Sequence, residues 1–221
     1  GLGDVYKRQV YAACDITEEQ ALAERFDITT LPTLLFIKNG DMKELNLNNL
    51  LDYKEAVEYF ANNKIDNVLS NSGNEHAIVI FDNIFKTAER NICLYAQDIF
   101  SNQNVVTVSP SYIESLRNFL SKEMTNMRIV LKDYDEINSC NCLRDILKQY
   151  YSKIELRKNR KGEVKIGENS VHFCIADGRM YRVEYDTNTR KARCNFNDKN
   201  AVSKYQTVFN QLFEASTPTY L

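Results

Sequence analysis

Ser170 and His172 have side chains of the types that carry out nucleophilic chemistry. They are separated by one residue in the stretch SVHFCIADG, which is apolar and typical of a β-strand. Because alternate residues of a strand point to the same face, the hydroxyl of Ser170 and the imidazole of His172 lie on one side. A serine needs an adjacent base to become a nucleophile, and His172 is placed to be that base. The alternative is that His172 is a strand histidine hydrogen-bonded to a neighbour.

A second group of candidates is basic. Arg157, Lys158, Arg160 and Lys161 surround a predicted turn at residues 160–162. Such a loop can hold the phosphates of DNA or RNA. No aromatic residues alternate with these cations, so base stacking is not indicated. The alternative is a solvated hairpin, and nucleic acid is therefore one partner among several that the sequence allows.

The six cysteines suggest neither a disulfide framework nor a metal centre. They are Cys14, Cys93, Cys140, Cys142, Cys174 and Cys194. No signal peptide is evident, so free thiols in a reducing cytoplasm are expected. Cys140 and Cys142 form a Cys-x-C pair, but a structural metal site usually needs further Cys or His ligands. We therefore predict no metal and no cofactor; one thiol at a helix start would be more reactive than usual.

Composition excludes several functional classes. The chain has 221 residues, is 43% hydrophobic and has a net charge of −2. It can build a large core, and its overall charge does not attract nucleic acid or an anionic membrane. No run of 18 apolar residues occurs, so a transmembrane helix is not predicted. The sequence does not predict the oligomeric state.

The first part of the chain has the pattern of a small α/β unit. Residues 33–38 (TLLFIK) form a continuous apolar run, the pattern of a strand buried on both faces, and Asn39-Gly40 is a strong hairpin signal. Pro32 stands at the start of this strand, where a missing amide donor is tolerated. The predicted order is strand, helix, strand, strand, helix over residues 10–15, 17–27, 33–38, 42–47 and 51–63.

The stretch AERFDITTLPTLLFIKNGDM resembles the C-terminal half of a thioredoxin fold. The resemblance covers residues 10–64 and implies a cis bond between Leu31 and Pro32. It also implies that Leu31, Pro32 and Thr33 dock a thiol substrate or protein partner. The Cys-x-x-Cys pair of that family is missing, so these residues are not expected to reduce disulfides. We expect residues 1–9 to be a non-native header and the native protein to begin further upstream.

The second part of the chain has strands alternating with helices, which predicts an α/β domain with helices on both faces of a mixed sheet. We expect a linker at 65–75, the domain at 76–215 and a tail at 216–221. Helices are predicted at 76–91, 110–123, 140–151 and 198–214, and strands at 91–96, 127–133, 153–158, within 170–186 and at 190–197.

Residues 76–215 resemble one half of a phospholipase D-like enzyme. That family has a His-x-Lys motif with an Asp seven residues after the His, and Asp177-Gly178 match the Asp and its turn. Ser170 stands at the His position and His172 at the Lys position, so the family's nucleophile is replaced. Asn195 stands roughly where the family has a later Asn. The resemblance implies a phosphate site with these three residues.

The sequence therefore predicts a two-part cytoplasmic protein. It joins a thioredoxin-like half domain to a degenerate phospholipase D-like domain that binds phosphate or a protein partner without catalysis. One alternative is a thiol-disulfide oxidoreductase whose Cys-x-x-Cys lies in missing upstream sequence. The other is a phosphodiesterase of the phospholipase D-like class with an altered site.

Overall fold

The computed structural model describes residues 12, 14–15, 18–132, 141–159, 164–166 and 169–220. Its contacts divide the chain into two units, with the boundary between Asn49 and Leu50. The helix at 51–63, which the sequence assigned to the first unit, belongs to the second. Among the described residues, no helix has both the length and the apolar character needed to cross a membrane.

The first unit contains helix α1 (Gln20–Arg25) and a hairpin of strands β1 (Thr33–Lys38) and β2 (Asp41–Asn46). Asn39 and Gly40 have φ values of 54° and 91°, as a tight hairpin turn with two left-handed residues requires. The Leu31–Pro32 bond is cis. The prediction that 33–38 is buried on both faces is wrong, because Ile37 is 57% exposed. Of the strand expected at 10–15, the described positions are not in a strand.

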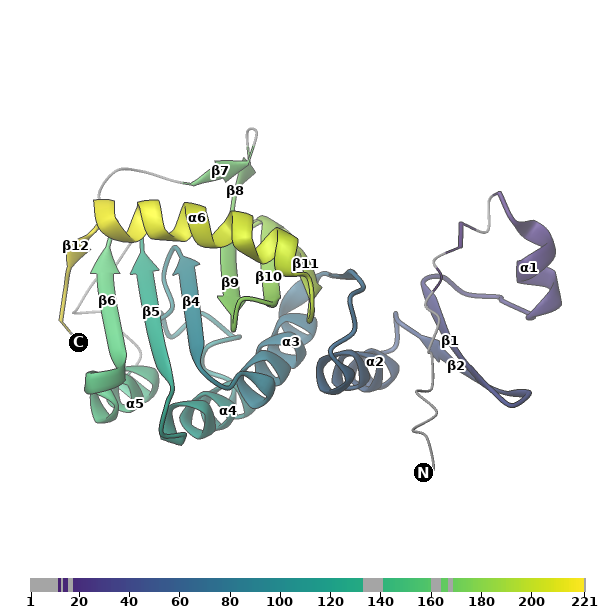
Figure 1. Cartoon of the computed structure of the whole chain (residues 1–221), viewed down its shortest axis with the longest axis horizontal. Helices are drawn as coiled ribbons and strands as arrows, with labels where there is room; N and C mark the ends of the chain where they lie inside the picture. The colour runs from purple at the N-terminus through teal and green to yellow at the C-terminus, as the bar shows by residue number, and fades with distance from the viewer. Residues whose placement is uncertain are drawn as a thin grey trace, which may run out of the picture. The chain divides into compact units, whose positions relative to one another are not determined.

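The second unit is built on one large sheet. Its strands are β3 (Leu69–Asn71), β4 (Asn91–Ala96), β5 (Asn126–Leu131), β6 (Ile154–Lys158), β9 (His172–Ala176), β10 (Met180–Asp186), β11 (Lys191–Asn195) and β12 (Thr217–Pro218). Within the described residues they form eight strands in the order β12-β6-β5-β4-β9-β10-β11-β3. The three strands β4, β5 and β6 run parallel, and the other neighbours are antiparallel. A short hairpin of β7 (Lys165–Ile166) and β8 (Asn169–Ser170) extends beyond the sheet (Figure 1).

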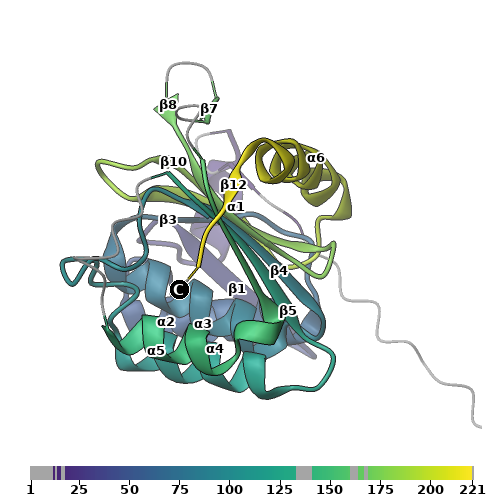
Figure 2. The same cartoon turned by 90° about the vertical axis from the view of Figure 1, so that its left-hand side faces the viewer.

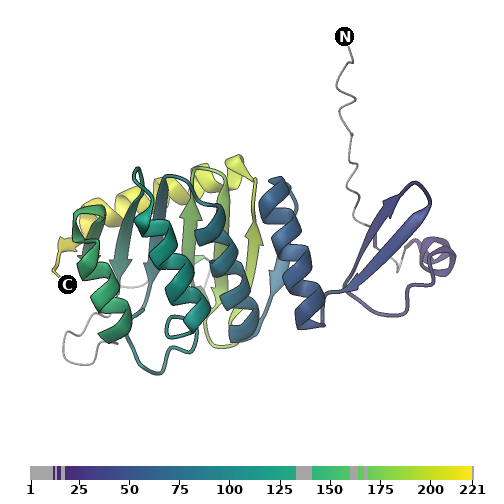
Figure 3. The same cartoon turned by 90° about the horizontal axis from the view of Figure 1, so that it is seen from below.

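Helices cover both faces of the sheet, as the alternating pattern predicts. They are α2 (Leu50–Asn63), α3 (Gly73–Thr87), α4 (Pro110–Ser121), α5 (Asn141–Gln149), the 3-10 turn η1 (Tyr151–Lys153) and α6 (Lys199–Ala215). Helix α6 crosses one face alone, while α2, α3, α4 and α5 lie in a row on the other (Figures 2 and 3).

The two faces bury different side chains of the same strands. Under α6, Phe209 and Phe213 pack on a cluster that includes Phe173 and Val183. Since strand side chains alternate, the neighbouring residues of β9 and β10 face α3 instead. Most of these are apolar, such as Cys174 and Met180, but Arg182 and Glu184 are also on this face and are at most 4% exposed. A buried pair of charges is the first sign of a site.

The linker predicted at 65–75 is more ordered than expected. Residues 69–71 form β3, which pairs with β11 as the last strand of the sheet, and α3 already begins at Gly73. Three residues are too short a run to show a strand period, so only their pairing with β11 reveals them.

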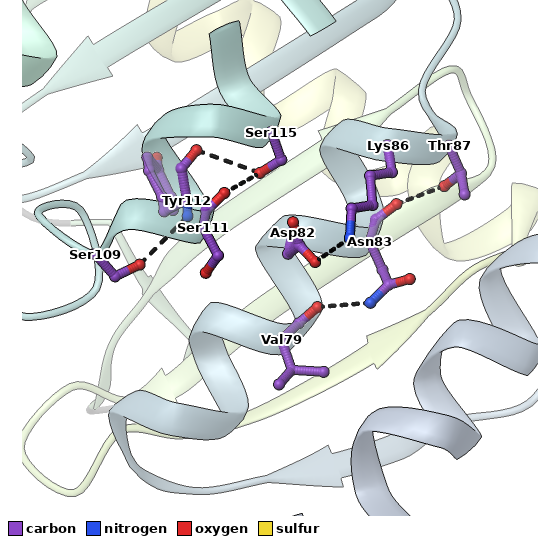
Figure 4. Close-up of polar contacts among 9 residues, drawn as sticks. All are labelled: Val79, Asp82, Asn83, Lys86, Thr87, Ser109, Ser111, Tyr112 and Ser115. Atoms are coloured by element: carbon purple, nitrogen blue, oxygen red, sulfur yellow. Dashed lines mark hydrogen bonds and ion pairs between the residues drawn. The ribbon is translucent and has the colours of Figure 1, made fainter. Parts of the chain in front are cut away.

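Helices α3 and α4 contain buried polar residues that are satisfied within each helix (Figure 4). Asp82 pairs with Lys86 at 2.6 Å, and Asn83 donates to the carbonyl of Val79 at 2.9 Å. In α4, the Ser109 hydroxyl caps the first turn by accepting from the amide of Tyr112. Since these groups find partners in their own helix, they serve to fix the two helices and are not candidates for ligand binding.

Candidate ligand-binding site

A cavity of about 390 Å³ lies at the end of the sheet where β4 finishes. Strands β9 and β10 form its floor, and α3, α4, the loop after β4 and the β10–β11 turn form its walls. Its lining includes Phe81, Tyr95, Asp98, Asn104, Tyr112, His172, Arg182, Glu184, Asn188 and Arg190. Its volume lies in the usual range of small-molecule sites, about 300–1,000 Å³. Helices α3 and α4 each precede a strand that runs toward this end, so their N-terminal, electropositive ends lie on the same side of the domain.

Glu184 is the centre of the polar groups in this cavity. One carboxylate oxygen, Oε2, is 3.0 Å from Nη1 of Arg182. The other, Oε1, is 3.4 Å from Nδ1 of His172 and 3.6 Å from Nη1 of Arg190. His172 and Glu184 are opposite one another in the β9–β10 pairing, which places the two side chains together. With Nδ1 directed at Glu184, Nε2 is the histidine nitrogen that remains for a ligand.

These partners keep Glu184 ionised. Burial by itself would raise the pKa of its carboxyl. The nearby His172 imidazole and the charges of Arg182 and Arg190 outweigh burial, so the pKa lies below its ordinary value. The site is therefore built around a buried carboxylate that carries its negative charge at neutral pH.

Acid should destabilise the domain through this carboxylate. Because the folded pKa of Glu184 is depressed, its contribution to the free energy of unfolding is complete above the unfolded pKa, about 4.3. It is lost as the pH falls through the lower folded value. We expect urea unfolding to show that the free energy of unfolding falls below about pH 4.3. This fall should be smaller in Glu184→Gln than in the wild type.

Asp186 provides the comparison for this experiment. The Thr189 hydroxyl and amide, and the Asn188 amide, lower its pKa too, but Asp186 is the last residue of β10 and is less buried than Glu184. Asp186→Asn should therefore also reduce the fall in the free energy of unfolding at low pH, independently of Glu184→Gln. An unchanged acid profile in Glu184→Gln would contradict the role given to the buried carboxylate.

Arg182 has unmet hydrogen-bonding capacity. It is 4% exposed, and its Nη1 donates to Glu184. Its Nε and Nη2 are enclosed and have no hydrogen-bond partner among the described residues. A buried donor without a partner costs about 1–3 kcal/mol. Nε and Nη2 form one edge of the guanidinium, the fork that accepts two oxygens of a carboxylate or phosphate.

Other groups around the cavity complement this fork. Asn104 donates through Nδ2 to the carbonyl of Asp98, while its buried Oδ1 has no donor among the described residues. The guanidinium of Arg182 also lies 5.4 Å from the centre of the Phe81 ring. Tyr112 packs against Phe81 edge-on at 5.4 Å. The cavity therefore combines aromatic walls with buried donors and acceptors.

A second cavity of about 330 Å³ adjoins the first. Its lining is mainly polar and includes Tyr95, Gln97, Lys132, Asn169, Ser170, His172, Asp186, Thr187 and Asn188. Five residues line both cavities and separate them: Tyr95, Gln97, His172, Thr187 and Asn188. No group of His, Cys, Asp and Glu side chains suited to a metal ion occurs in the described part of the chain.

The structure brings together two of the three predicted phosphate-site residues. Ser170, in β8, and His172 line the same second cavity. Asn195 pairs with Tyr181 on β10, whereas His172 pairs with Glu184, so Asn195 lies about 10 Å further along the strands. Its side chain donates to Asp66 at 2.9 Å and accepts from the amide of residue 197. Asn195 is therefore a buried structural residue, and its assignment to this site is wrong.

Asp177, which matches the family's motif, is also structural. Its carboxylate accepts hydrogen bonds from the amides of Glu89, Arg90 and Asn91 at 2.7, 3.0 and 3.0 Å. It therefore holds the start of β4 to the β9–β10 turn. Its φ of 52° is left-handed, which suits the tight turn before Gly178.

The other predicted residues that the structure describes do not line either cavity. Leu31, Pro32 and Thr33 belong to the first unit, and their docking role stays a prediction. The Arg157 guanidinium lies 3.9 Å from the centre of the Phe213 ring and donates to the main-chain carbonyl of Phe213.

The remaining basic-loop residues give the nucleic-acid hypothesis no further support. Lys158 pairs with Thr217 in the sheet, and Arg160 and Lys161 lie outside the described residues. Binding of nucleic acid through this loop stays a prediction. Cys140, the first cysteine of the Cys-x-C pair, also lies outside the described residues.

Arg190 is a residue of the site that the sequence did not indicate. Arg182 and Glu184 alternate along one strand, a spacing that fits either cross-strand ion pairs or a polar site shared with His172. Arg182, Glu184 and Asp186 alternate on one face of β10, which is also the pattern of a solvated face. The sequence therefore did not show that Arg182 and Glu184 are buried.

No protein-family model matches the chain, and no curated protein matches it in sequence. Nuc from Salmonella typhimurium, described as a phospholipase D family member, is a similar solved structure. It has 14% identity and a TM-score of 0.50, and the match covers 71% of this chain and 100% of Nuc.

Two other solved structures are less similar. TrmBL2, described as an archaeal chromatin protein with a novel mode of DNA binding, has 12% identity over 92% of this chain and 82% of its own, with a TM-score of 0.48. NucT from Helicobacter pylori has 9% identity over 69% and 100%, with a TM-score of 0.44. None of the three is described as a thioredoxin-like protein. The likeness to Nuc shows a phospholipase D-like α/β fold, with a large mixed sheet flanked by helices.

Proposed function

We propose that the second unit binds a small phosphate-bearing molecule in the cavity beside Arg182. The observation that carries this proposal is the buried Nε–Nη2 edge of Arg182, which has no acceptor among the described residues. A phosphate group offers two oxygens at the spacing of this fork. Glu184 fixes the opposite side of the guanidinium, so the fork is oriented before a ligand arrives.

The rest of the cavity supports a small ligand. Its aromatic walls can contact the organic part, and Asn104 Oδ1 can accept from a hydroxyl or amine. His172 is placed to contact the ligand through Nε2. The resemblance of the fold to the phospholipase D family is consistent with phosphate chemistry but carries no activity by itself.

Arg182→Lys should weaken the binding of phenyl phosphate about tenfold, because lysine keeps the charge and loses the fork. Isothermal titration calorimetry on the whole chain measures the change. Arg179→Lys is the matched control. Arg179 donates to the carbonyls of Phe196 and Thr87 and lines neither cavity. Equal affinity in wild type and Arg182→Lys, or an equal loss in Arg179→Lys, would contradict the proposal.

Phosphodiester hydrolysis is the second candidate function. It is favoured by the contact between His172 Nδ1 and Glu184, which orients the imidazole at the wall between the two cavities. Against it, a serine stands where the resembling family has its histidine nucleophile. Ser170 and His172 line the same cavity, so a serine nucleophile with a histidine base is the form this activity would take.

We expect no hydrolysis of bis-p-nitrophenyl phosphate above the buffer rate, because the family's nucleophile is replaced. Release of nitrophenolate, followed by absorbance, measures this directly. Hydrolysis by the wild type that disappears in both His172→Ala and Ser170→Ala would make the second function correct. Asn195→Ala does not serve as a control for catalysis, since Asn195 holds Asp66 elsewhere in the domain.

A further inference from the structure

We infer that the cavity selects phosphate monoesters over phosphodiesters and that Arg190 makes this selection. This inference rests on the proposed function, because it assumes that a phosphate group lies beside Arg182. The selection depends on how many terminal phosphate oxygens and negative charges the cavity can bind. The arginines and carboxylates that line the cavity determine both numbers.

The charged side chains of the cavity are equal in number but differ in their hydrogen bonds. Its described lining contains Arg182 and Arg190 and the carboxylates of Glu184 and Asp98. Glu184 accepts a hydrogen bond from Arg182, and Asp98 Oδ1 accepts from the amide of Phe100 at 2.7 Å. Arg190 contacts Glu184 only at 3.6 Å, so its guanidinium is the one that can exchange this contact for a ligand. A monoester carries two negative charges above its second pKa, about 6, whereas a diester carries one.

Counting oxygens leads to the same preference. The free edge of Arg182 takes two terminal oxygens of a phosphate. A diester has two terminal oxygens, so that edge uses both. A monoester has a third, which needs another donor. Arg190 lines the same cavity and is the nearest remaining cation to Glu184.

Arg190 is placed to change partners. Its Nη1 lies 3.6 Å from Glu184 Oε1, which is an ion pair beyond hydrogen-bonding distance, and its side chain is 36% exposed. Arg182, in contrast, is buried and hydrogen-bonded to Glu184. Arg190 also lies in the turn between β10 and β11, where Asp186 holds the backbone through Asn188 and Thr189. A ligand can therefore draw Arg190 from Glu184 without moving the floor of the cavity.

The test compares two probes that differ by one methyl group and one charge. Phenyl phosphate is the monoester and methyl phenyl phosphate is the diester. Calorimetry on the whole chain, at a pH well above about 6, should show binding of the monoester at least about tenfold tighter. Arg190→Gln should weaken the monoester about tenfold and change the diester less than about twofold.

Arg193→Gln is the matched control, since it removes the same charge from a neighbouring strand. Arg193 is exposed, lies over the Tyr185 ring and lines neither cavity. It should leave both affinities unchanged. Thermal unfolding shows whether each variant is folded, and Arg190→Asn, which tolerates the φ of 58° at this position, replaces Arg190→Gln if that variant unfolds.

The outcomes separate this inference from the proposed function. Diester binding as tight as monoester binding in the wild type overturns the inference and leaves the phosphate site in place. A monoester preference that survives in the Arg190 variant shows that Arg190 does not make the selection. Failure of the wild type to bind either probe overturns the proposed function, and the inference with it.

Discussion

Glu184→Leu should lower the free energy of unfolding by about 3–5 kcal/mol, because it leaves the buried guanidinium of Arg182 without its carboxylate. Arg182 is 4% exposed and donates a hydrogen bond to Glu184 Oε2. Its other donors are already without partners among the described residues. Removing Glu184 therefore leaves the whole charge uncompensated in the interior. Urea unfolding followed by circular dichroism measures the loss.

The double variant Arg182→Met/Glu184→Leu should recover most of that loss. Replacing a buried ion pair by apolar side chains of similar size is often neutral or stabilising. Methionine at 182 can pack against Phe81, which the guanidinium already contacts. A double-mutant cycle should give a coupling of about 2–3 kcal/mol between the two positions. Losses that simply add would show that the two side chains do not stabilise each other.

The fold was predictable where a long period or a turn signal marks each element. Strand β4 and helix α6 were expected within a few residues of where they lie, because their apolar positions repeat at the period of their structure. The β9–β10 hairpin followed from Asp177-Gly178, whose left-handed φ values of 52° and 66° suit those residues. Strand β3 carries no such signal and exists only through its pairing with β11.

The candidate site was predictable only in part, because it depends on the register of strands. The two-residue spacing predicts that Ser170 and His172 lie on one side of a single strand, whereas they belong to β8 and β9 and line the same cavity. Which residue of the next strand faces His172 depends on the β9–β10 pairing, and that residue is Glu184. Asn195 was matched by its distance along the sequence, but β11 pairs with β10 so that Asn195 lies opposite Tyr181. Matching a family's motif therefore predicted the type of residue, but it did not predict the position of Asn195 in the sheet.

Burial was the other quantity that the sequence did not contain. The burial of Arg182 and Glu184 could not be predicted, because nothing in β10 shows that α3 covers this face. Under the proposed function, Arg182 contributes to both stability and ligand binding, and these two contributions oppose each other. The Nε–Nη2 edge of Arg182 costs stability while it has no acceptor, and a bound phosphate would remove that cost. Ligand binding and folding are then expected to be linked, with the unfolding temperature rising as phenyl phosphate is added.

Asp177→Ala should destabilise the domain by about 3 kcal/mol. Its carboxylate accepts from the amides of Glu89, Arg90 and Asn91, and hydrogen bonds to a charged group are worth about 1.5–3 kcal/mol each. Water can reach part of this turn, which reduces the sum. Alanine at a φ of 52° adds about 1 kcal/mol of strain. The loss should appear in urea unfolding and should leave the cavity's charges unchanged, since Asp177 does not line it.

Two further substitutions at this position separate the causes. Asp177→Asn keeps an oxygen that can accept from Arg90 and Asn91 and tolerates the left-handed φ, so it should cost about 1 kcal/mol. Asp177→Gly removes the strain but restores no hydrogen bond, so it should remain close to alanine, about 1 kcal/mol milder. Equal losses in Asn and Ala would show that the carboxylate does not hold the start of β4. The matching aspartate of the motif would then need a role other than the structural one assigned to it.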